Sequence, residues 1–254
     1  IVLLIFLVLI KIQDSNFVRK VENISYDAYQ SLFIEKSNFD EVVIIDIDEK
    51  SIGEIGQFPW RRDIFADLIQ KLNQYGVSVI TFDVFFSEED KQNPKKILEE
   101  FNIKNDTVFD SDQKLLESIQ SSNVILPVLG DISMYNKDNS SKPKTNIISK
   151  GSDPSDYVYR FKNKITSLEK FNNAAKGVGT ISYLDSPDGV LRSLPIFLKI
   201  EDDIWPALSL ETLRVLHGHK SILINSDETG INLIKTRKYQ IEPDPNAIVH
   251  INFK

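Results

Sequence analysis

The 254-residue chain contains no cysteine and only one methionine. The absence of cysteine excludes disulfide bonds, thiolate metal sites and cysteine nucleophiles, but it does not fix the cellular compartment. Clusters of basic residues are missing as well: 30 Lys and Arg stand against 37 Asp and Glu, for a net charge of −7. Because a phosphate backbone would repel such a chain, the composition argues against nucleic acid as a partner.

The sequence also lacks the common catalytic signatures. It has no Gly-x-Gly-x-x-Gly segment, no P-loop and no Ser-His-Asp arrangement. His217 and His219 form a His-Gly-His pair at the end of a predicted helix, but no third ligand is spaced to complete a zinc site. We therefore expect no catalytic residue, no metal centre and no cofactor in this chain.

A wholly apolar run opens the chain and stops at Lys11. As a helix its ten residues would rise about 15 Å, roughly half the thickness of a bilayer core. A signal-peptide core or a buried helix of a soluble domain would give the same run. The run consists of Leu, Phe and β-branched residues without a break. This composition favours a third interpretation, in which residues 1–12 are the truncated end of a transmembrane helix.

Residues 13–33 are predicted to form one long amphipathic helix. Its apolar positions are spaced nearly as in a coiled-coil seam: Phe17, Val21, Ile24, Ala28 and Leu32. Such a helix could transmit movement from a membrane or join two copies in a homodimer. A helix packed along its own domain is the other interpretation that the pattern allows.

The next part of the chain has the pattern of an α/β fold. Val42–Ile47 is a continuous apolar run, typical of a strand buried on both faces of a parallel sheet. An amphipathic helix follows with Gly76 as its left-handed terminator, and Val77–Phe82 is the next predicted strand. A helix over Asp112–Ser121 and a strand over Val124–Val128 repeat the alternation. We therefore predict a three-layer α/β fold with a mixed, largely parallel central sheet, preceded by the long N-terminal helix.

The second half of the chain is less regular. Residues 130–160 are polar and rich in turn formers, which predicts a long surface excursion. A hairpin is expected next, with strands Val178–Tyr183 and Val190–Ile200 joined by a turn at Asp188-Gly189. A helix over Ala207–Leu216 and short strands complete the prediction, the strands at Ser221–Ile224, Gly230–Ile234 and Ile248–Phe253.

Charged and aromatic residues follow the two predicted strands at one edge of the sheet. Asp46 and Asp48 stand two apart at a strand end, and Asp83 follows the next strand. Three carboxylates at such an edge could contact a small polar ligand or an ion. They could equally pair with Arg61 or Arg62, and Trp60 could either cover the core or stack on a ligand. The residues alone leave both interpretations open.

The Asp46-x-Asp48 pair also resembles the start of the haloacid-dehalogenase phosphatases. Lys50 stands where that family has Thr or Val, and no matching downstream carboxylate pair or Lys is found. A metal-dependent phosphohydrolase using Asp46 and Asp48 is therefore the alternative rather than the main prediction.

The ordered set of motifs resembles the CHASE type 2 domains. The first motif, Asp-x-Asp-Glu-x-Ser, is matched from Asp46 to Ser51, and a Gly-x-x-Pro-Trp-x-Arg loop is matched from Gly56 to Arg62. Later matches are Asp83 with the aromatic-Ser-Glu at residues 86–88, the Asp-Gly-Val-x-Arg from Asp188 to Arg192, and the Pro-x-Leu at residues 206–208. The match covers nearly the whole chain apart from residues 130–160. Arg61 stands where the family often has Pro.

The resemblance implies an extracytoplasmic sensory domain of a bacterial membrane receptor, spanning residues 13–254 and following a transmembrane helix. In such receptors the output comes from a cytoplasmic cyclase or kinase domain, which this chain does not contain. The expected input is an unknown small polar ligand or ion. The candidate ligand-binding residues are Asp46, Asp48, Trp60, Arg62, Asp83, Asp188 and Arg192.

Overall fold

A computed structural model describes residues 16–33, 41–103, 107–131, 140–184, 186 and 188–252. The chain divides into two compact units, one of Ile1–Ile47 with Ile251–Lys254 and one of Asp48–His250.

The smaller unit contains helix α2 (Asn16–Leu32). The hydroxyl of Tyr26 on this helix donates a hydrogen bond to the backbone carbonyl of Ile251, near the other end of the chain. Residues 1–12, where the end of a membrane helix is predicted, lie outside the described residues.

The predicted strand Val42–Ile47 is wrong. These residues belong to no strand, and Val42, Val43, Ile44 and Ile45 are 70%, 80%, 88% and 53% exposed. An apolar run becomes a buried strand only where neighbouring strands pair with it. Within the larger unit, strand β2 (Val124–Asp131) pairs with β1 (Ile80–Thr81), β5 (Asn163–Thr166) and β6 (Gly177–Thr180).

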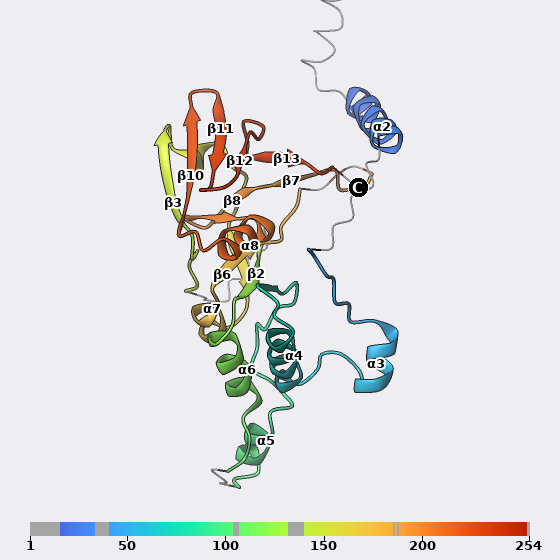
Figure 1. The fold of residues 1–254 in the computed structure, drawn as a ribbon, viewed down its shortest axis with the longest axis vertical. Coiled ribbons are helices and arrows are strands. Elements are labelled where there is room, and N and C mark those ends of the chain that lie inside the picture. The colour runs from blue at the N-terminus through green and yellow to red at the C-terminus, as the bar shows by residue number, and fades with distance from the viewer. Residues whose placement is uncertain are drawn as a thin grey trace, which may run out of the picture. The chain divides into compact units, whose positions relative to one another are not determined.

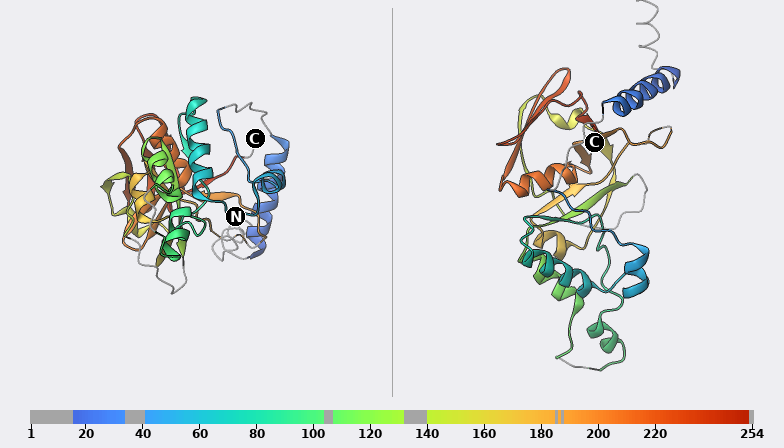
Figure 2. Two further views of the ribbon diagram at one scale, coloured as in Figure 1. Left: turned by 90° about the horizontal axis from the view of Figure 1, so that it is seen from below. Right: turned by 45° about the vertical axis from the view of Figure 1, so that its right-hand side comes forward.

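The larger unit alternates helices and strands over its first half and is mostly β in its second half (Figures 1 and 2). Its helices are α3 (Glu49–Ile55), α4 (Arg62–Gln74), α5 (Pro94–Glu100), α6 (Ser111–Gln120), the 3-10 turn η1 (Pro154–Asp156), α7 (Glu169–Ala174) and α8 (Leu208–Leu216). The helices predicted before Gly76, over Asp112–Ser121 and over Ala207–Leu216 are thus confirmed as α4, α6 and α8. Gly76 has the positive φ of 80° that its predicted role as a terminator requires.

The first sheet is mixed and mainly parallel. Strand β2 (Val124–Asp131) pairs in parallel with β1 (Ile80–Thr81) and β6 (Gly177–Thr180), and antiparallel with β5 (Asn163–Thr166). Helix α8 packs on β6 and β2, while α4 packs against α6 (Figure 1). The mixed α/β class is therefore confirmed, although β1 is only two residues long.

The remaining strands form three further sheets rather than extensions of one central sheet. Strands β12 (Gln240–Ile241), β11 (Gly230–Lys235), β10 (Ser221–Asp227) and β3 (Asn146–Gly151) form one of them. Strands β4 (Arg160–Phe161), β8 (Phe197–Ile200) and β9 (Asp203–Pro206) form the second, and β13 (Ile248–His250) pairs with β7 (Ser193–Pro195) in the third.

Two predictions for the second half are corrected by these pairings. The hairpin is wrong because β6 pairs with β2, whereas β7 and β8 pair with strands elsewhere in the sequence. In the predicted surface excursion 130–160, Asn146–Gly151 form the mostly exposed strand β3, which pairs in parallel with β10 over six residues, and residues 132–139 lie outside the described residues. Neither pairing has a local signal, because each joins segments far apart in the sequence.

Glycines let α8 approach β6 closely. A Cβ atom added at Gly179 would lie 2.6 Å from the Cα of Leu208 in α8. Backbone atoms cannot move away as a flexible side chain can, so overpacking is expected here.

Gly179→Ala should therefore lower the free energy of unfolding by about 1–3 kcal/mol, measured by urea denaturation. Gly53→Ala is the matched control: a Cβ at Gly53 in α3 meets nothing within 4 Å. The control should be neutral or slightly stabilising, because Ala favours a helix by up to about 1 kcal/mol over Gly. Equal effects at the two positions would contradict the close approach of α8 and β6.

Candidate functional site

Trp60 lies at the start of the candidate site and is buried. Its indole Nε1 donates a hydrogen bond of 2.6 Å to the carbonyl of Gly56, and its ring packs near Phe58 and Phe65. The rings of Phe65 and Phe86 meet edge to face at 5.2 Å, which continues the aromatic cluster into the core. Of the two predicted roles for Trp60, the structure shows the one in which it covers the core.

Arg61 forms a local ion pair at the first turn of α4. Its Nε and Nη2 donate to the two carboxylate oxygens of Asp63 at 2.5 and 2.9 Å. The guanidinium also lies 5.5 Å from the ring centroid of Phe109. The hydrogen bonds from Arg61 hold the pKa of Asp63 below its ordinary value.

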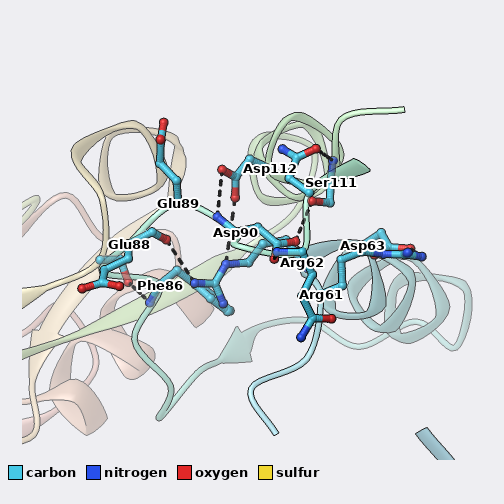
Figure 3. A network of polar contacts seen from close by, with 12 residues as sticks. Arg61, Arg62, Asp63, Phe86, Glu88, Glu89, Asp90, Ser111 and Asp112 are labelled. Carbon is cyan, nitrogen blue, oxygen red and sulfur yellow. Dashed lines mark hydrogen bonds and ion pairs between the residues drawn. The ribbon is translucent and has the colours of Figure 1, made fainter. Parts of the chain in front are cut away.

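Arg62 points the other way, into a buried polar network (Figure 3). Its Nη2 donates to the carbonyl of Glu88 at 3.1 Å, and its Nε lies 4.0 Å from Oδ1 of Asp112. The guanidinium packs 4.8 Å above the ring of Phe86. Burial lowers the pKa of Arg62, and the charges of Asp90 and Asp112 oppose that shift.

Asp90 is the centre of this network (Figure 3). Its Oδ2 accepts the backbone N–H of Arg62 at 2.8 Å and the hydroxyl of Ser111 at 2.6 Å. Its own N–H donates to Oδ2 of Asp112 at 3.3 Å, the same oxygen that lies 3.3 Å from Nζ of Lys170. The Asp90 carboxylate thus accepts a backbone N–H that has no partner within α4. Its negative charge also offsets the positive end of the helix dipole, where Arg61 and Arg62 lie.

Two further helices begin at the same place. Asn93 caps α5 by accepting the N–H of Lys95 at 3.2 Å, and Asp110 caps α6 by accepting the N–H of Gln113 at 3.1 Å. The Nδ2 of Asn93 donates to Oδ1 of Asp110 at 2.8 Å, which joins the two caps. The N-termini of α4, α5 and α6 are therefore held together through side-chain carboxylates and amides.

The geometry of the Arg62 network is that of a brace. Asp112 is 2% exposed and Arg62 9% exposed, so neither side chain presents its charge to solvent. A buried ion pair of this kind fixes the elements that supply it, here α4, the loop after β1 and the start of α6. We call this set, Arg62, Asp90, Ser111 and Asp112, the Arg62 brace.

The predicted carboxylates that lie in the larger unit, Asp48 and Asp83, do not belong to the Arg62 brace. Asp46 is exposed in the smaller unit, and Asp83 is exposed just after β1. Asp48 does not end a strand; it caps α3, where its Oδ1 accepts the N–H of Ser51 at 2.8 Å. Within the larger unit, the partners of Arg62 are thus Glu88, Asp90 and Asp112 rather than the predicted Asp83.

Asp188 and Arg192 are brought together, in the turn where the sequence placed them. Nη1 of Arg192 lies 3.0 Å from Oδ1 and 2.9 Å from Oδ2 of Asp188. The same carboxylate accepts the Ser186 hydroxyl and the N–H of Val190. Hydrogen bonds, first from Arg192 and then from Ser186, hold the pKa of Asp188 well below its usual range.

Sequence reasoning missed Asp90 and Asp112 as parts of the site. The Asp110-Ser111-Asp112 run at the start of a predicted helix is an N-cap pattern, so a cap there could have been found. Asp90 has no comparable signal. Its contacts with Arg62 and Ser111 span 28 and 21 residues, and only the fold brings these residues together.

Glu211 and Arg214 form a second buried ion pair, on α8. Nη2 and Nε of Arg214 donate to the two carboxylate oxygens of Glu211 at 2.6 and 2.7 Å. The remaining donors of Arg214 reach the carbonyl of His219 at 2.7 Å and that of Lys176 at 3.0 Å. The hydroxyl of Thr145 donates to Glu211 as well, so this pair links α8 to the segments before β6 and β3.

Comparison with known families gives one match: the family model of the CHASE2 domain matches residues 1–254, the whole chain. The chain belongs to the CHASE2 domain family. CHASE2 domains are extracytoplasmic sensory domains and not catalytic ones. No curated protein and no solved structure matches the chain. The resemblance drawn from the order of the sequence motifs is therefore confirmed.

In this CHASE2 domain the Pro-Trp-Arg-Arg segment is a structural element. Trp60 closes the aromatic core, Arg61 binds Asp63, and Arg62 enters the brace. Within the ranges described above, no group of three or more His, Asp or Glu side chains is arranged to hold a metal ion. Over the same ranges no helix has both the length and the apolarity that a membrane crossing requires.

The Arg61–Asp63 pair makes a pH-dependent contribution to the stability of the CHASE2 domain. In the folded state the pKa of Asp63 lies below its ordinary value of 3.8. The stabilisation that the pair gives is therefore complete above pH 3.8 and is lost as the pH falls through the folded pKa. Asp63→Asn should destabilise the protein at pH 7. The difference from the parent should narrow below about pH 4, as Asp63 becomes protonated in the parent. Urea denaturation from pH 7 to pH 2.5 measures it, and a difference that widens toward acid would contradict the pairing.

Proposed function

We propose that this CHASE2 domain is the signal-input domain of a bacterial membrane receptor and lies on the extracytoplasmic side of the membrane. Its signal would regulate a cyclase or kinase domain carried elsewhere in the receptor. The observation that carries this proposal is the family match over the whole chain, since the family is one of extracytoplasmic sensory domains.

The buried networks support a domain that responds by changing shape rather than by performing chemistry. The Asp90 carboxylate is occupied by donors of the protein itself, Arg62, Ser111 and Gln92. Arg62 is in turn covered by the ring of Phe86. A ligand shifts the equilibrium between two conformations only if it binds one of them more tightly. Closely packed ion pairs favour two distinct conformations over a continuous deformation.

The input is proposed to be a small polar molecule or an ion. The exposed carboxylates among the predicted residues are the groups that such a ligand could contact first: Asp46, Asp48, Asp83 and Asp188. Arg62 and Trp60 are the least suited of the candidate residues to direct contact, because both are buried in protein contacts. Asp83→Asn should therefore alter the output of the receptor without a loss of folded protein.

The location is tested by cysteine labelling in intact cells. Lys91→Cys in the full-length receptor places a thiol at a side chain that is 84% exposed, in a domain that has no cysteine of its own. A membrane-impermeant maleimide should label this variant in cells whose outer layers admit the reagent but whose cytoplasmic membrane is intact. The parent receptor reports any background from cysteines outside the domain. Labelling that appears only after the cytoplasmic membrane is lysed would overturn the proposal.

A further inference from the structure

Strand β3 is the longest edge strand among the strands that the structure describes. It ends the sheet β12-β11-β10-β3 and pairs only with β10, over six residues and without a bulge (Figure 1). The strand at the opposite edge of this sheet, β12, is two residues long, and no described strand that ends another sheet has more than four. Short edge strands give another chain little to pair with. Among the described strands, β3 is therefore the edge that is least protected against such pairing.

The free side of β3 presents a row of backbone donors and acceptors. The N–H groups of Asn146 and Ser152 donate to carbonyls on the β10 side at 3.2 and 3.1 Å. Because backbone groups alternate in direction along a strand, the N–H and C=O groups of Ile147 and Ser149 point away from β10. Another extended backbone is the structure that matches such a row. The chemistry of this edge therefore specifies a β-strand as its occupant.

The side chains of β3 make the edge complementary to itself. Ile147 packs against the core, so Ile148 points to the other face of the sheet, where it is 47% exposed. In an antiparallel pair centred on Ile148, the two copies of this side chain lie opposite each other, and Lys150 lies opposite Asn146. Lys150 is the one charged residue of β3, so no like charges meet directly across the pair.

We propose that β3 pairs antiparallel with β3 of a second copy of this chain, with Ile148 at the two-fold axis. In this register Ile147 of each copy exchanges both backbone hydrogen bonds with Ser149 of the other. The four-stranded sheets of the two copies then form one continuous sheet across the contact. The proposal rests on β3 and its own sheet and does not depend on the proposed function.

The length of the strand predicts the strength of the contact. Strand β3 has six residues, which corresponds to a length of about 20 Å. A pair of such strands buries less surface than the roughly 1,200 Å² of a typical stable interface. The contact is therefore weak and reversible, and a covalent trap is the suitable way to detect it.

Disulfide trapping of the 254-residue chain tests the proposal, because the chain has no cysteine of its own. Opposite residues of a non-hydrogen-bonded pair have Cα atoms about 4.5 Å apart, within reach of a disulfide. Ile148→Cys should therefore form the linked dimer at least about ten times faster under mild oxidation than Ile165→Cys, the matched control on β5, where the isoleucine is 42% exposed. Lys150→Cys should also be slow, because the two copies of residue 150 lie about 14 Å apart along the paired strands.

A proline variant distinguishes backbone pairing from chance collision. Ser149→Pro removes an N–H that faces away from β10, so the ladder between β3 and β10 keeps its hydrogen bonds. Urea denaturation checks that this variant folds. Because each copy loses a donor to the other, Ser149→Pro should lower the trapping rate of Ile148→Cys at least about tenfold.

Four outcomes decide the proposal. Fast trapping of Ile148→Cys alone, slowed by Ser149→Pro, supports the pairing. Equal rates for Ile148→Cys and Ile165→Cys overturn it, since the edge then does not join two copies. Trapping of Lys150→Cys as fast as that of Ile148→Cys overturns the register. Fast trapping of Ile148→Cys that Ser149→Pro leaves unchanged overturns the backbone pairing. None of these results changes the labelling of Lys91→Cys, so a failure here is distinguishable from a failure of the proposed location.

Discussion

Glu211→Gln is expected to lower the free energy of unfolding of the 254-residue chain by about 3–5 kcal/mol, one of the two largest effects of a single substitution that the structure predicts. Glu211 is fully buried and binds Arg214 through both carboxylate oxygens. The amide removes the charge without opening a cavity. It leaves the Arg214 guanidinium buried without its counter-charge, which is the costly way to break such a pair.

An exposed pair of the same type provides the control for Glu211→Gln. Lys50 and Glu54 stand four apart on α3 with side chains 80% and 70% exposed. Glu54→Gln should cost less than about 0.5 kcal/mol, because water screens an exposed pair. Urea denaturation of both variants at pH 7 measures the difference. A cost at Glu211 as small as that at Glu54 would show that Arg214 finds other partners or reaches water.

Arg62→Met is expected to cost a similar amount, about 3–5 kcal/mol. Methionine keeps much of the apolar contact with Phe86 but removes the more deeply buried of the two cations, Arg62 and Lys170, that lie beside the Asp112 carboxylate, which is 2% exposed. The adjacent Arg61→Met is the control, because the Arg61 side chain is 41% exposed and its pair with Asp63 is local. It should cost about 1 kcal/mol or less. Similar losses for the two variants would contradict the distinction between the Arg62 brace and a local pair whose cation reaches solvent.

The sequence was most informative where the interactions are local. The amphipathic spacing of α4, α6 and α8 predicted these helices, and the Asp188-Gly189 turn signal predicted the site of the Asp188–Arg192 pair. Glycine at residue 76 ends α4 as its position implied. In each case the physical cause lies within about one helical turn or one tight turn, so a pattern in the sequence can express it.

Long-range pairings were the part that the sequence could not predict. Val42–Ile47 has the composition of a buried strand, yet its four leading apolar side chains are exposed. Residues Asn146–Gly151 looked like surface loop, yet they pair with β10. The composition of a segment indicates whether it can form a strand. Which strand it pairs with depends on the rest of the fold.

The same limit applies to the candidate site. The sequence suggested that Arg61 or Arg62 pairs with Asp46, Asp48 or Asp83, because these carboxylates follow predicted strands. The structure supplies Asp90 and Asp112, which reach Arg62 through a loop and a helix start. The choice among several carboxylates depends on distances that only the folded chain defines.

The most direct test of the Arg62 brace is a double-mutant cycle between Arg62 and Asp112. The free energies of unfolding of the parent, Arg62→Met, Asp112→Asn and the double variant are measured by urea denaturation at pH 7. A brace predicts that the double variant loses at least about 1 kcal/mol less than the sum of the two single losses, because either single variant already removes the buried Arg62–Asp112 contact. Losses that add to within about 0.5 kcal/mol, with Arg62→Met costing less than about 1 kcal/mol, would contradict it.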